Sequence, residues 1–513
     1  MLSSVLSSAV LGVEAHPVEV EADLAGGLPG FTVVGLPDPS VRESRERVAA
    51  ALKNCGFHFP ARRITINLAP AGMRKEGALY DLPIAIGLLV SSEQLDPFPW
   101  RKVLVVGELS LDGDLRPVRG VLPMAILARR LGVRSVLLPP ENAEEAAIVD
   151  SLEVRPARSL AEAVEILRAP EKHAAYVPAG DGGDGRLTMP DLSDVRGQEQ
   201  AKRAVEVAAA GGHNVILIGP PGSGKTMIAR RLPSLLPELT REEALDVTRV
   251  YSVAGLLPRR SSLMRYRPFR APHHSTSDAG LVGGGAYPRP GEISLAHHGV
   301  LFLDELPEFN RSTLEMIRQP LEDRCVTIPR VHATLRFPAD IMLVAAMNPC
   351  PCGYFTDPKH DCTCTPNMIE RYLSRISGPL IDRIDIHIEV PPVPWRELRA
   401  DSPGGMDSAI MRTQVVAARQ RQHRRFGGRA GADSAAAATN AAMASRQVRR
   451  HCRLDEAGEM LLKQAMNELG LSARAHDKVL RIARTIADIE GEEGIRPHHL
   501  AEAIQYRRLD RRL

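Results

Sequence analysis

The chain has 513 residues, of which 44% are hydrophobic and 25% are charged, and its formal net charge is +3. This composition is typical of a globular protein, the length suggests about three domains, and the weak positive charge does not by itself indicate nucleic acid as a partner. No stretch reaches about 18 uncharged apolar residues, so we expect no membrane-spanning helix. The cysteines outside one cluster stand singly, which favours a reduced, cytoplasmic environment.

The first 170 residues predict a mixed α/β domain. The alternating segment VEVEADL, residues 18–24, predicts a first strand, and no Lys or Arg precedes the apolar residues as in a secretory signal. Helix-like and strand-like runs then alternate, at 40–56 (helix), 62–70 (strand), 103–109 (strand), 121–132 (helix) and 133–139 (strand). Gly, Asp and Pro dominate residues 171–190, which we interpret as a linker.

A strand–loop–helix unit with the sequence NVILIGPPGSGKTMIARRL carries the strongest functional pattern. Its loop fits the phosphate-binding pattern G-x-x-x-x-G-K-[ST]. The loop residues are Gly219, Pro220, Pro221, Gly222, Ser223, Gly224, Lys225 and Thr226. Backbone N–H groups and the helix N-terminus would hold the phosphates, Lys225 would reach the β- and γ-phosphates, and Thr226 would ligate Mg²⁺. We therefore predict a Mg²⁺-dependent ATP site.

Two further apolar strands end in polar residues that suit this site. In GVLFLDELPEF, Asp304 would support the Mg²⁺ ion and Glu305 would polarise the attacking water, although the two acids could instead cap the next helix. The strand IMLVAAMN ends in Asn348, which could orient water or contact the γ-phosphate. Prolines near residue 393 indicate another boundary, and the remainder to residue 513 has the apolar spacing of helices.

The order of these three strands resembles the AAA+ ATPase core, with its Walker A, Walker B and sensor 1 motifs. The resemblance implies that Arg383, in ISGPLIDRIDIHIEV, is an arginine finger that acts on the ATP of a neighbouring subunit in a ring. Arg371 and Arg375 are rival fingers, and a local ion pair with Asp382 or Asp385 is the alternative role of Arg383.

The same resemblance assigns roles outside the core motifs. It implies that Arg474 is the sensor 2 arginine of a helical lid, with a solvated helix arginine as the alternative. It also places Val195 and Gln198, in DLSDVRGQEQAKRAVEVAA, near the adenine base.

Two further segments narrow the family. FRAPHHSTSDAGLVGGG lies between the first two motifs, and NPCPCGY follows the third strand. With these segments, essentially the whole chain resembles the ComM/YifB family of competence proteins, often described as magnesium-chelatase-like. The resemblance implies an α/β fold of three parts: a Lon-protease-like (ribosomal S5-like) domain over 1–170, an AAA+ P-loop core of the helix-2-insert class over 191–393, and a C-terminal helical lid over 394–513.

The resemblance also implies an activity, that of a hexameric helicase that drives branch migration of DNA during natural transformation. The alternatives are a chelatase motor subunit and a protein-remodelling AAA+ scaffold. By resemblance, the hairpin before the third strand faces a central pore, so Arg330, His332 and Arg336 are the expected DNA contacts. An arginine cluster at 419–429, RQRQHRRFGGR, would be either a further phosphate contact or a solvated helix face.

The N-terminal segments similar to the Lon catalytic regions lack the residues that proteolysis needs. RKEGALYDLPIAIGLL contains no Ser, and GELSLDGDLRPVRGVLPMAILARR contains no Lys. Because the Ser–Lys pair cannot form, we expect a non-proteolytic domain used for assembly or for holding DNA.

Four cysteines lie within CPCGYFTDPKHDCTC, residues 350–364. They are Cys350, Cys352, Cys362 and Cys364. Four thiolates suit tetrahedral Zn²⁺, although the spacing is not the C-x2-C of common zinc ribbons. Free thiols or disulfides are the alternatives, and His360 is a substitute ligand. We expect an insertion beside the ATP site that a structural zinc ion holds rigid.

Overall fold

The structure is a computed structural model that describes residues 2–178, 190–258, 263–285, 288–329, 334–355, 357, 359–394, 407–427 and 439–507. The chain divides into two compact units. The first comprises Met1–Asp184, Arg241–Met264 and Pro329–Phe337, and the second comprises Gly185–Thr240, Arg265–Ile328 and Pro338–Leu513. Among the described residues, none of the helices combines the length and apolar character that a membrane span requires.

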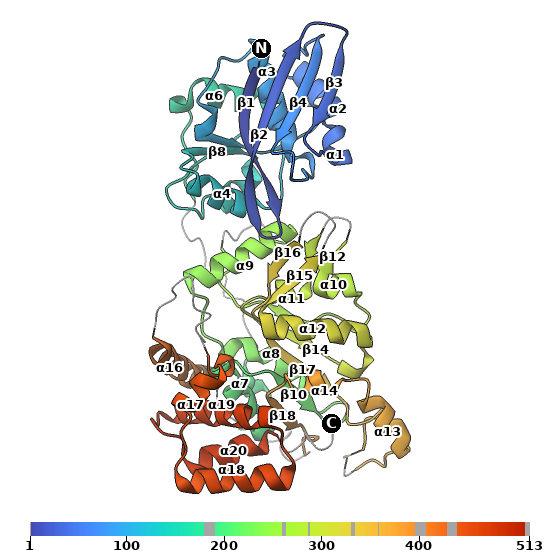
Figure 1. The fold of residues 1–513 in the computed structure, drawn as a ribbon, viewed down its shortest axis with the longest axis vertical. Coiled ribbons are helices and arrows are strands. Elements are labelled where there is room, and N and C mark those ends of the chain that lie inside the picture. Colours follow the sequence, from blue (N-terminus) through green and yellow to red (C-terminus); the bar gives the residue numbers. More distant parts are fainter. Residues whose placement is uncertain are drawn as a thin grey trace. The chain divides into compact units, whose positions relative to one another are not determined.

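The first unit is built on a seven-stranded mixed sheet with the order β3-β4-β2-β1-β5-β8-β9. The strands are β1 (Leu2–Leu11), β2 (Glu14–Ala25), β3 (Gly30–Val34), β4 (Arg63–Ala69), β5 (Val103–Val105), β8 (Ser135–Leu138) and β9 (Glu153–Pro156). The predicted strands are confirmed, with 103–109 divided between β5 and the short strand β6 (Glu108–Leu109), which pairs with β7 (Leu115–Arg116) outside this sheet. The sequence did not predict β1, whose serines break the apolar alternation, although the strand pairs along its length with β2 in an antiparallel hairpin. Figure 1 shows β1–β4 side by side.

Helices complete this unit. They are α1 (Pro39–Arg42), α2 (Ser44–Asn54), α3 (Asp81–Ser91), α4 (Val121–Arg130), α5 (Ala143–Ala146), α6 (Leu160–Arg168) and α9 (Arg241–Ala254). The predicted helices are confirmed, with 40–56 divided at Glu43 between α1 and α2. Helix α9 packs against α4 although it is distant in sequence, and Gly120 N donates to Ser252 O at 3.1 Å.

The second unit contains a five-stranded parallel sheet with the order β11-β14-β17-β10-β18. The strands are β10 (Val215–Ile218), β11 (Phe269–Arg270), β14 (Val300–Leu303), β17 (Met342–Met347) and β18 (Ile386–Glu389). The central strands β10, β14 and β17 are fully buried, which explains their uninterrupted apolar sequences. Since β17 separates β10 from β14, the polar residues that follow all three strands meet at one edge of the sheet.

Shorter elements surround this sheet. They are α7 (Glu199–Gly211), α8 (Lys225–Leu235), α10 (Asp278–Val282), α11 (Glu292–Leu295), α12 (Arg311–Asp323), α13 (Pro366–Leu373) and α14 (Gly378–Ile381). Two short strand pairs are separate from the five-stranded sheet, β12 (Gly283–Gly284) with β13 (Arg289–Pro290) and β15 (Cys325–Pro329) with β16 (Thr334–Pro338), and residues 334–337 of β16 are assigned to the first unit. The second pair confirms the predicted hairpin before β17.

The C-terminal region is helical, as predicted. Its helices are α16 (Ser408–Phe426), α17 (Ser445–His451), α18 (Glu456–Leu469), α19 (Ala473–Glu490) and α20 (Pro497–Gln505). They form one group (Figure 1), and α16 and α19 pack on α7. Their apolar residues share one core with β10 and β17, so this region and the sheet are one packed body.

Candidate functional site at the edge of the parallel sheet

The predicted phosphate loop follows β10, and its last two residues, Lys225 and Thr226, begin α8. Gly222 and Gly224 adopt φ values of +76° and +91°, which favour glycine. A Cβ atom on Gly219 would lie 2.1 Å from the Val390 carbonyl oxygen, so no side chain fits there. The hydroxyl of Ser223 is buried and, within the described part of the chain, makes no hydrogen bond. The loop therefore has the form of an anion cradle, with an unused polar group for a phosphate.

Lys225 points back into this loop. Its Nζ donates to the carbonyl oxygens of Gly219 at 2.7 Å and Pro220 at 2.9 Å, and to Asn348 Oδ1 at 3.2 Å. Burial lowers the pKa of Lys225, and the carboxylates of Asp304 and Glu305 oppose that shift. The contact with Asn348 links the phosphate loop to the end of β17.

Thr226 and Asp304 form the part of the site that fits Mg²⁺. Thr226 Oγ1 donates to Asp304 Oδ2 at 2.7 Å, so a hydroxyl and a carboxylate oxygen, both ligands that Mg²⁺ prefers, converge at the start of α8. The other oxygen, Asp304 Oδ1, accepts from the backbone N–H of Glu305 at 3.0 Å.

Glu305 has an unusual backbone conformation for a non-glycine residue, with φ of +52°. Its side chain is half exposed and forms no capping hydrogen bond to the turn that follows, which disfavours the helix-cap alternative. Such conformations cost free energy and persist only where the surrounding structure imposes them. They are concentrated at functional sites, which is consistent with a site role for Glu305.

His274 is a site residue that the sequence did not identify. Its Nδ1 lies 3.1 Å from Glu305 Oε2, and its ring packs near those of His273 and Phe309. The segment FRAPHHSTSDAG marked the family, but nothing in its local pattern showed that one histidine reaches a carboxylate on another element.

The two residues predicted near the base differ in their placement. Gln198 adopts φ of +60° at the start of α7, and its side-chain amide donates to Ser223 O at 3.3 Å and to Pro391 O. Val195 is 3% exposed and belongs to the core. Gln198 therefore contacts the phosphate loop directly, whereas Val195 is a residue of the apolar core.

The three candidate arginine fingers have different partners. Arg383 is 14% exposed on its side chain, pairs with Glu322 of α12, and donates to the Pro379 carbonyl at 2.5 Å. Arg375 is half exposed and lies 3.0 Å from Glu308. Arg371 is exposed in the last turn of α13. The structure therefore gives Arg383 an intramolecular partner, and this partner is neither of the flanking aspartates.

Arg474 lies at the first turn of α19, where its side chain is 75% exposed and 3.7 Å from Asp382. In the described part of the chain, no hydrogen bond or ion pair joins it to residues 219–226. One turn later, Lys478 is buried and forms an ion pair with Asp385 at 3.1 Å. Helix α19 is thus attached to the segment that carries Arg383.

The same segment is held from the sheet side. His213 Nδ1 lies 3.2 Å from Asp385 Oδ2, and its Nε2 lies 2.9 Å from Thr485 Oγ1 of α19. The side-chain amide of Asn214 donates to Arg383 O at 3.0 Å. The backbone around Arg383 is therefore fixed by polar groups from both the sheet and α19.

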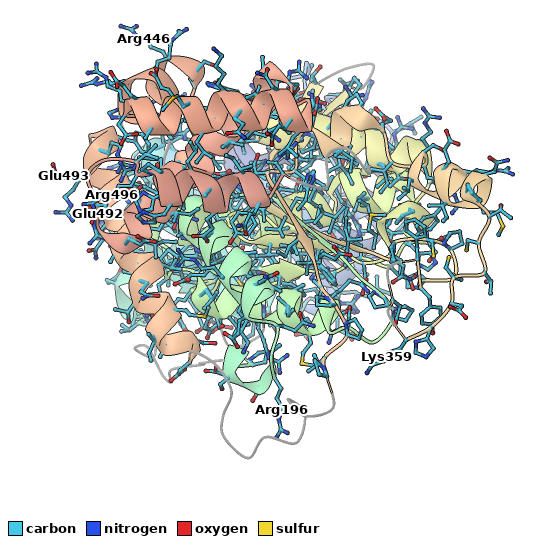
Figure 2. The ribbon with its side chains drawn as sticks, turned by 90° about the horizontal axis from the view of Figure 1, so that it is seen from below. Arg196, Lys359, Arg446, Glu492, Glu493 and Arg496 are labelled. Carbon is cyan, nitrogen blue, oxygen red and sulfur yellow. The ribbon has the colours of Figure 1, made fainter. Side chains whose placement is uncertain are left out.

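The cysteine cluster brings its four sulfur atoms together. The four side chains can offer one ligand atom each within 4.8 Å of one another, and all four cysteines are free thiols. The disulfide alternative is therefore wrong, because S–S bonds are near 2.05 Å. His360 Nδ1 lies 3.4 Å from Asp357 and is not part of the group. The neighbouring Lys359 projects outward from the loop between the cysteine pairs (Figure 2).

The expected DNA contacts are only partly described. Arg330 and His332 lie outside the described residues, and Arg336 is exposed on β16. In the lid cluster, Arg419 donates to the Ala209 carbonyl, while Arg421 and Arg425 contact Asp488 of α19. These three arginines hold the helices together, which favours a structural role for most of the cluster.

A parallel sheet with a phosphate loop, an Asp–Glu pair and an asparagine at one edge defines a phosphate-loop nucleotide-binding protein with an AAA-like core. Family models of the magnesium chelatase subunit ChlI match three segments: 191–398 (magnesium chelatase, subunit ChlI), 20–142 (subunit ChlI of Mg-chelatase) and 405–507 (subunit ChlI C-terminal).

Similar proteins cover the whole chain. The competence protein ComM of Haemophilus influenzae is 46% identical over 100% of this chain and 98% of its own length. The uncharacterised YifB of Escherichia coli is 45% identical with the same coverage, and an uncharacterised protein of Mycobacterium tuberculosis is 42% identical over 99% of this chain and 98% of its own length. The chain therefore belongs to the ComM/YifB family of magnesium-chelatase-like ATPases.

Proposed function

We propose that this protein is a ring-forming AAA+ ATPase of the helix-2-insert class that acts as a DNA motor, a helicase promoting branch migration in natural transformation or recombination. The observation that carries the ATPase part is the convergence of Lys225, Asn348 and the Thr226–Asp304 pair at one edge of the parallel sheet. The DNA part rests on family membership and on the relative named as a competence protein.

The roles proposed for the site residues follow from their contacts. Lys225 would exchange loop carbonyls for phosphate oxygens, and Thr226 with Asp304 would hold Mg²⁺, which supplies charge neutralisation when bound. Glu305 would orient and polarise the attacking water, and Asn348 would position that water or the γ-phosphate. Donation from Gln198 to the phosphate loop supports its place beside the nucleotide.

Each subunit of the proposed ring would have three parts. They are a non-proteolytic, Lon-like domain (1–170), a core (191–393) and a lid (394–513). Arg383 is the proposed arginine finger, which would leave Glu322 when a neighbouring subunit binds. Arg474 is the proposed sensor 2, and Arg336 with Arg330 and His332 the proposed DNA contacts.

The cysteine cluster is proposed to bind one structural Zn²⁺. Its four sulfur atoms supply the ligand set of a closed structural zinc site. Thiolates bind Zn²⁺ in preference to Mg²⁺, which favours oxygen ligands. Loss of the metal would leave four thiols in a loop that has little apolar core of its own.

The test is steady-state ATPase activity of the full chain, alone and with single-stranded, duplex and four-way-junction DNA across a salt series. A Lys225→Ala variant is the matched control for contaminating activity. Stimulation by DNA that weakens with salt would support a DNA motor, and a preference for junctions would support branch migration. Robust ATPase activity that ignores every DNA would contradict the motor and favour a protein-remodelling or chelatase role.

A further inference from the structure

We infer that the cysteine cluster, when it holds Zn²⁺, positions the phosphate loop, so that nucleotide binding and hydrolysis depend on zinc bound outside the nucleotide site. This inference rests on the proposed ATPase function and adds a means of controlling it. Three observations carry it: the sulfur geometry, the covalent link to Asn348, and a close contact between Gly353 and Pro221.

The sulfur geometry fits a tetrahedral zinc ion. The sulfur of Cys350 lies 3.3 Å from that of Cys352 and 3.7 Å from that of Cys362, and the latter two lie 3.5 Å apart. Zn–S bonds of about 2.3 Å place tetrahedral ligands about 3.8 Å apart. The group therefore needs only small adjustments to accept the ion.

Backbone N–H groups already point at two of the sulfur atoms. Gly353 N lies 3.2 Å from the sulfur of Cys350, and Cys352 N lies 3.4 Å from the sulfur of Cys364. Donors of this kind stabilise thiolates and orient metal ligands. The cluster thus has supporting groups as well as the four ligands.

The cluster is joined to the nucleotide site through the chain. Cys350 is fully buried and follows Asn348 by two residues, and Asn348 accepts a hydrogen bond from Lys225. On the other side, Thr365 directly follows Cys364 and caps α13 through its hydroxyl. A metal ion that fixes Cys350 against Cys364 therefore fixes the end of β17 relative to α13.

The cluster also touches the phosphate loop through space. A Cβ atom on Gly353 would lie 2.6 Å from Cδ and 2.8 Å from Cγ of Pro221, so the turn of the cluster rests directly on the proline ring. Gly353 adopts φ of +90°, and its N–H donates to Cys350 O at 3.0 Å, which closes the turn. Catalytic groups must be held within about 0.5 Å of their productive positions. A direct contact on Pro221 can therefore determine whether the phosphate loop is correctly placed.

The test compares two glycine variants of the full-length protein. Gly353→Ala forces Pro221 to move, whereas Gly427→Ala imposes the same backbone strain, at φ of +89°, where no atom lies within 4 Å of the added Cβ. Zinc per chain, the affinity for a fluorescent ADP analogue with Mg²⁺, and ATP turnover are measured for both variants and the unaltered protein. A zinc-extracted sample and the same sample after zinc is restored complete the set.

We expect about one zinc ion per chain in all three proteins. Gly353→Ala should keep its zinc but lose turnover by about tenfold to a hundredfold and bind ADP more weakly, while Gly427→Ala should match the unaltered protein. Extraction of zinc should weaken ADP binding, and its return should restore it.

Several outcomes would overturn the inference. If the purified protein contains no zinc and does not take it up, the metal site is refuted. If nucleotide affinity is equal in the two glycine variants, or equal with and without zinc, the coupling is refuted while the ATPase proposal stands. Failure of the unaltered, zinc-loaded protein to bind any nucleotide would instead refute the proposed function, and the coupling with it.

Discussion

Glu305 combines a left-handed backbone conformation with a contact to His274, so its carboxylate has a defined position beside the Thr226–Asp304 pair. Glu305→Gln keeps the shape of the side chain and removes its charge. We expect the variant to retain ATP but to hydrolyse it about a hundredfold more slowly or worse, and the trapped ATP should stabilise the ring. Turnover assays and nucleotide retention on gel filtration measure this. Hydrolysis at the normal rate would show that Glu305 has a different role.

His274 is expected to position Glu305 and not to bind nucleotide. His274→Ala should lower kcat by about tenfold with KM nearly unchanged, because the half-exposed carboxylate would then sample more orientations. His274→Gln, which can still donate a hydrogen bond, should recover part of the loss. A rise in KM without a change in kcat would argue that His274 acts on substrate binding.

At the scale of single residues, the sequence predicted the groups that belong to local motifs. The phosphate loop, Asp304, Glu305 and Asn348 each follow an apolar strand, and the physical rules for parallel sheets bring them together. Contacts such as His274 with Glu305 join residues from separate elements, so their proximity depends on packing that no local pattern encodes.

Helix α19 is anchored to the Arg383 segment by a buried ion pair. Lys478→Met would leave Asp385 charged and buried beside a neutral side chain, and we expect it to lower the free energy of unfolding by about 3–5 kcal/mol. Chemical denaturation measures the loss. Arg474→Ala, on the exposed first turn of the same helix, should leave stability nearly unchanged. Equal effects of the two variants would contradict the anchoring role of Lys478.

The same ion pair makes stability depend on pH. Burial favours protonated Asp385, but Lys478 and His213 outweigh it and hold the pKa of Asp385 below its usual range. Burial also lowers the pKa of Lys478, against the pull of Asp385, yet lysine starts near 10.4 and remains charged in acid.

A carboxyl whose pKa is lower in the folded state contributes stability above its unfolded pKa of about 3.9 and loses it as the pH falls through the folded value. We therefore expect the free energy of unfolding to fall below about pH 4, and to fall less steeply in Asp385→Asn. Denaturation curves between pH 3 and pH 6 would measure both slopes, and identical slopes would contradict the assignment.

At the scale of elements, periodicity predicted most helices and strands, because their apolar residues repeat with the spacing that burial requires. Strand β1 was not predicted because it is a central strand in which Ser3, Ser7 and Ser8 are buried among apolar residues. The structural role of the lid arginines at 419–429 was also not predicted. A basic cluster looks the same in sequence whether its members face solvent or, like Arg425 with Asp488, join two helices.

In the whole assembly, the proposed role of Arg383 requires a neighbouring subunit. Arg383→Ala should abolish most turnover while nucleotide still binds. A mixture of the Arg383→Ala and Glu305→Gln proteins should recover part of the activity. In a mixed ring, a Glu305→Gln subunit can place its Arg383 at the ATP site of an Arg383→Ala subunit, whose Glu305 is intact. Turnover in mixtures of varied ratio measures this, and Arg375→Ala in place of Arg383→Ala is the control. Mixtures no more active than the average of their parts would contradict action between subunits and favour a local role with Glu322.

The discontinuous first unit has a consequence for dissecting this protein. Since α9 and residues 329–337 belong to that unit but follow the linker in the chain, the chain passes between the two units repeatedly. A fragment starting near residue 191 would keep α9 without the α4 surface that it packs on and without the Gly120 N–H that donates to Ser252 O. If such a fragment were inactive, the loss of this packing and the resulting misfolding would explain the result as well as any functional role of the missing segment. Point substitutions in the full-length chain are therefore the better way to study the first unit.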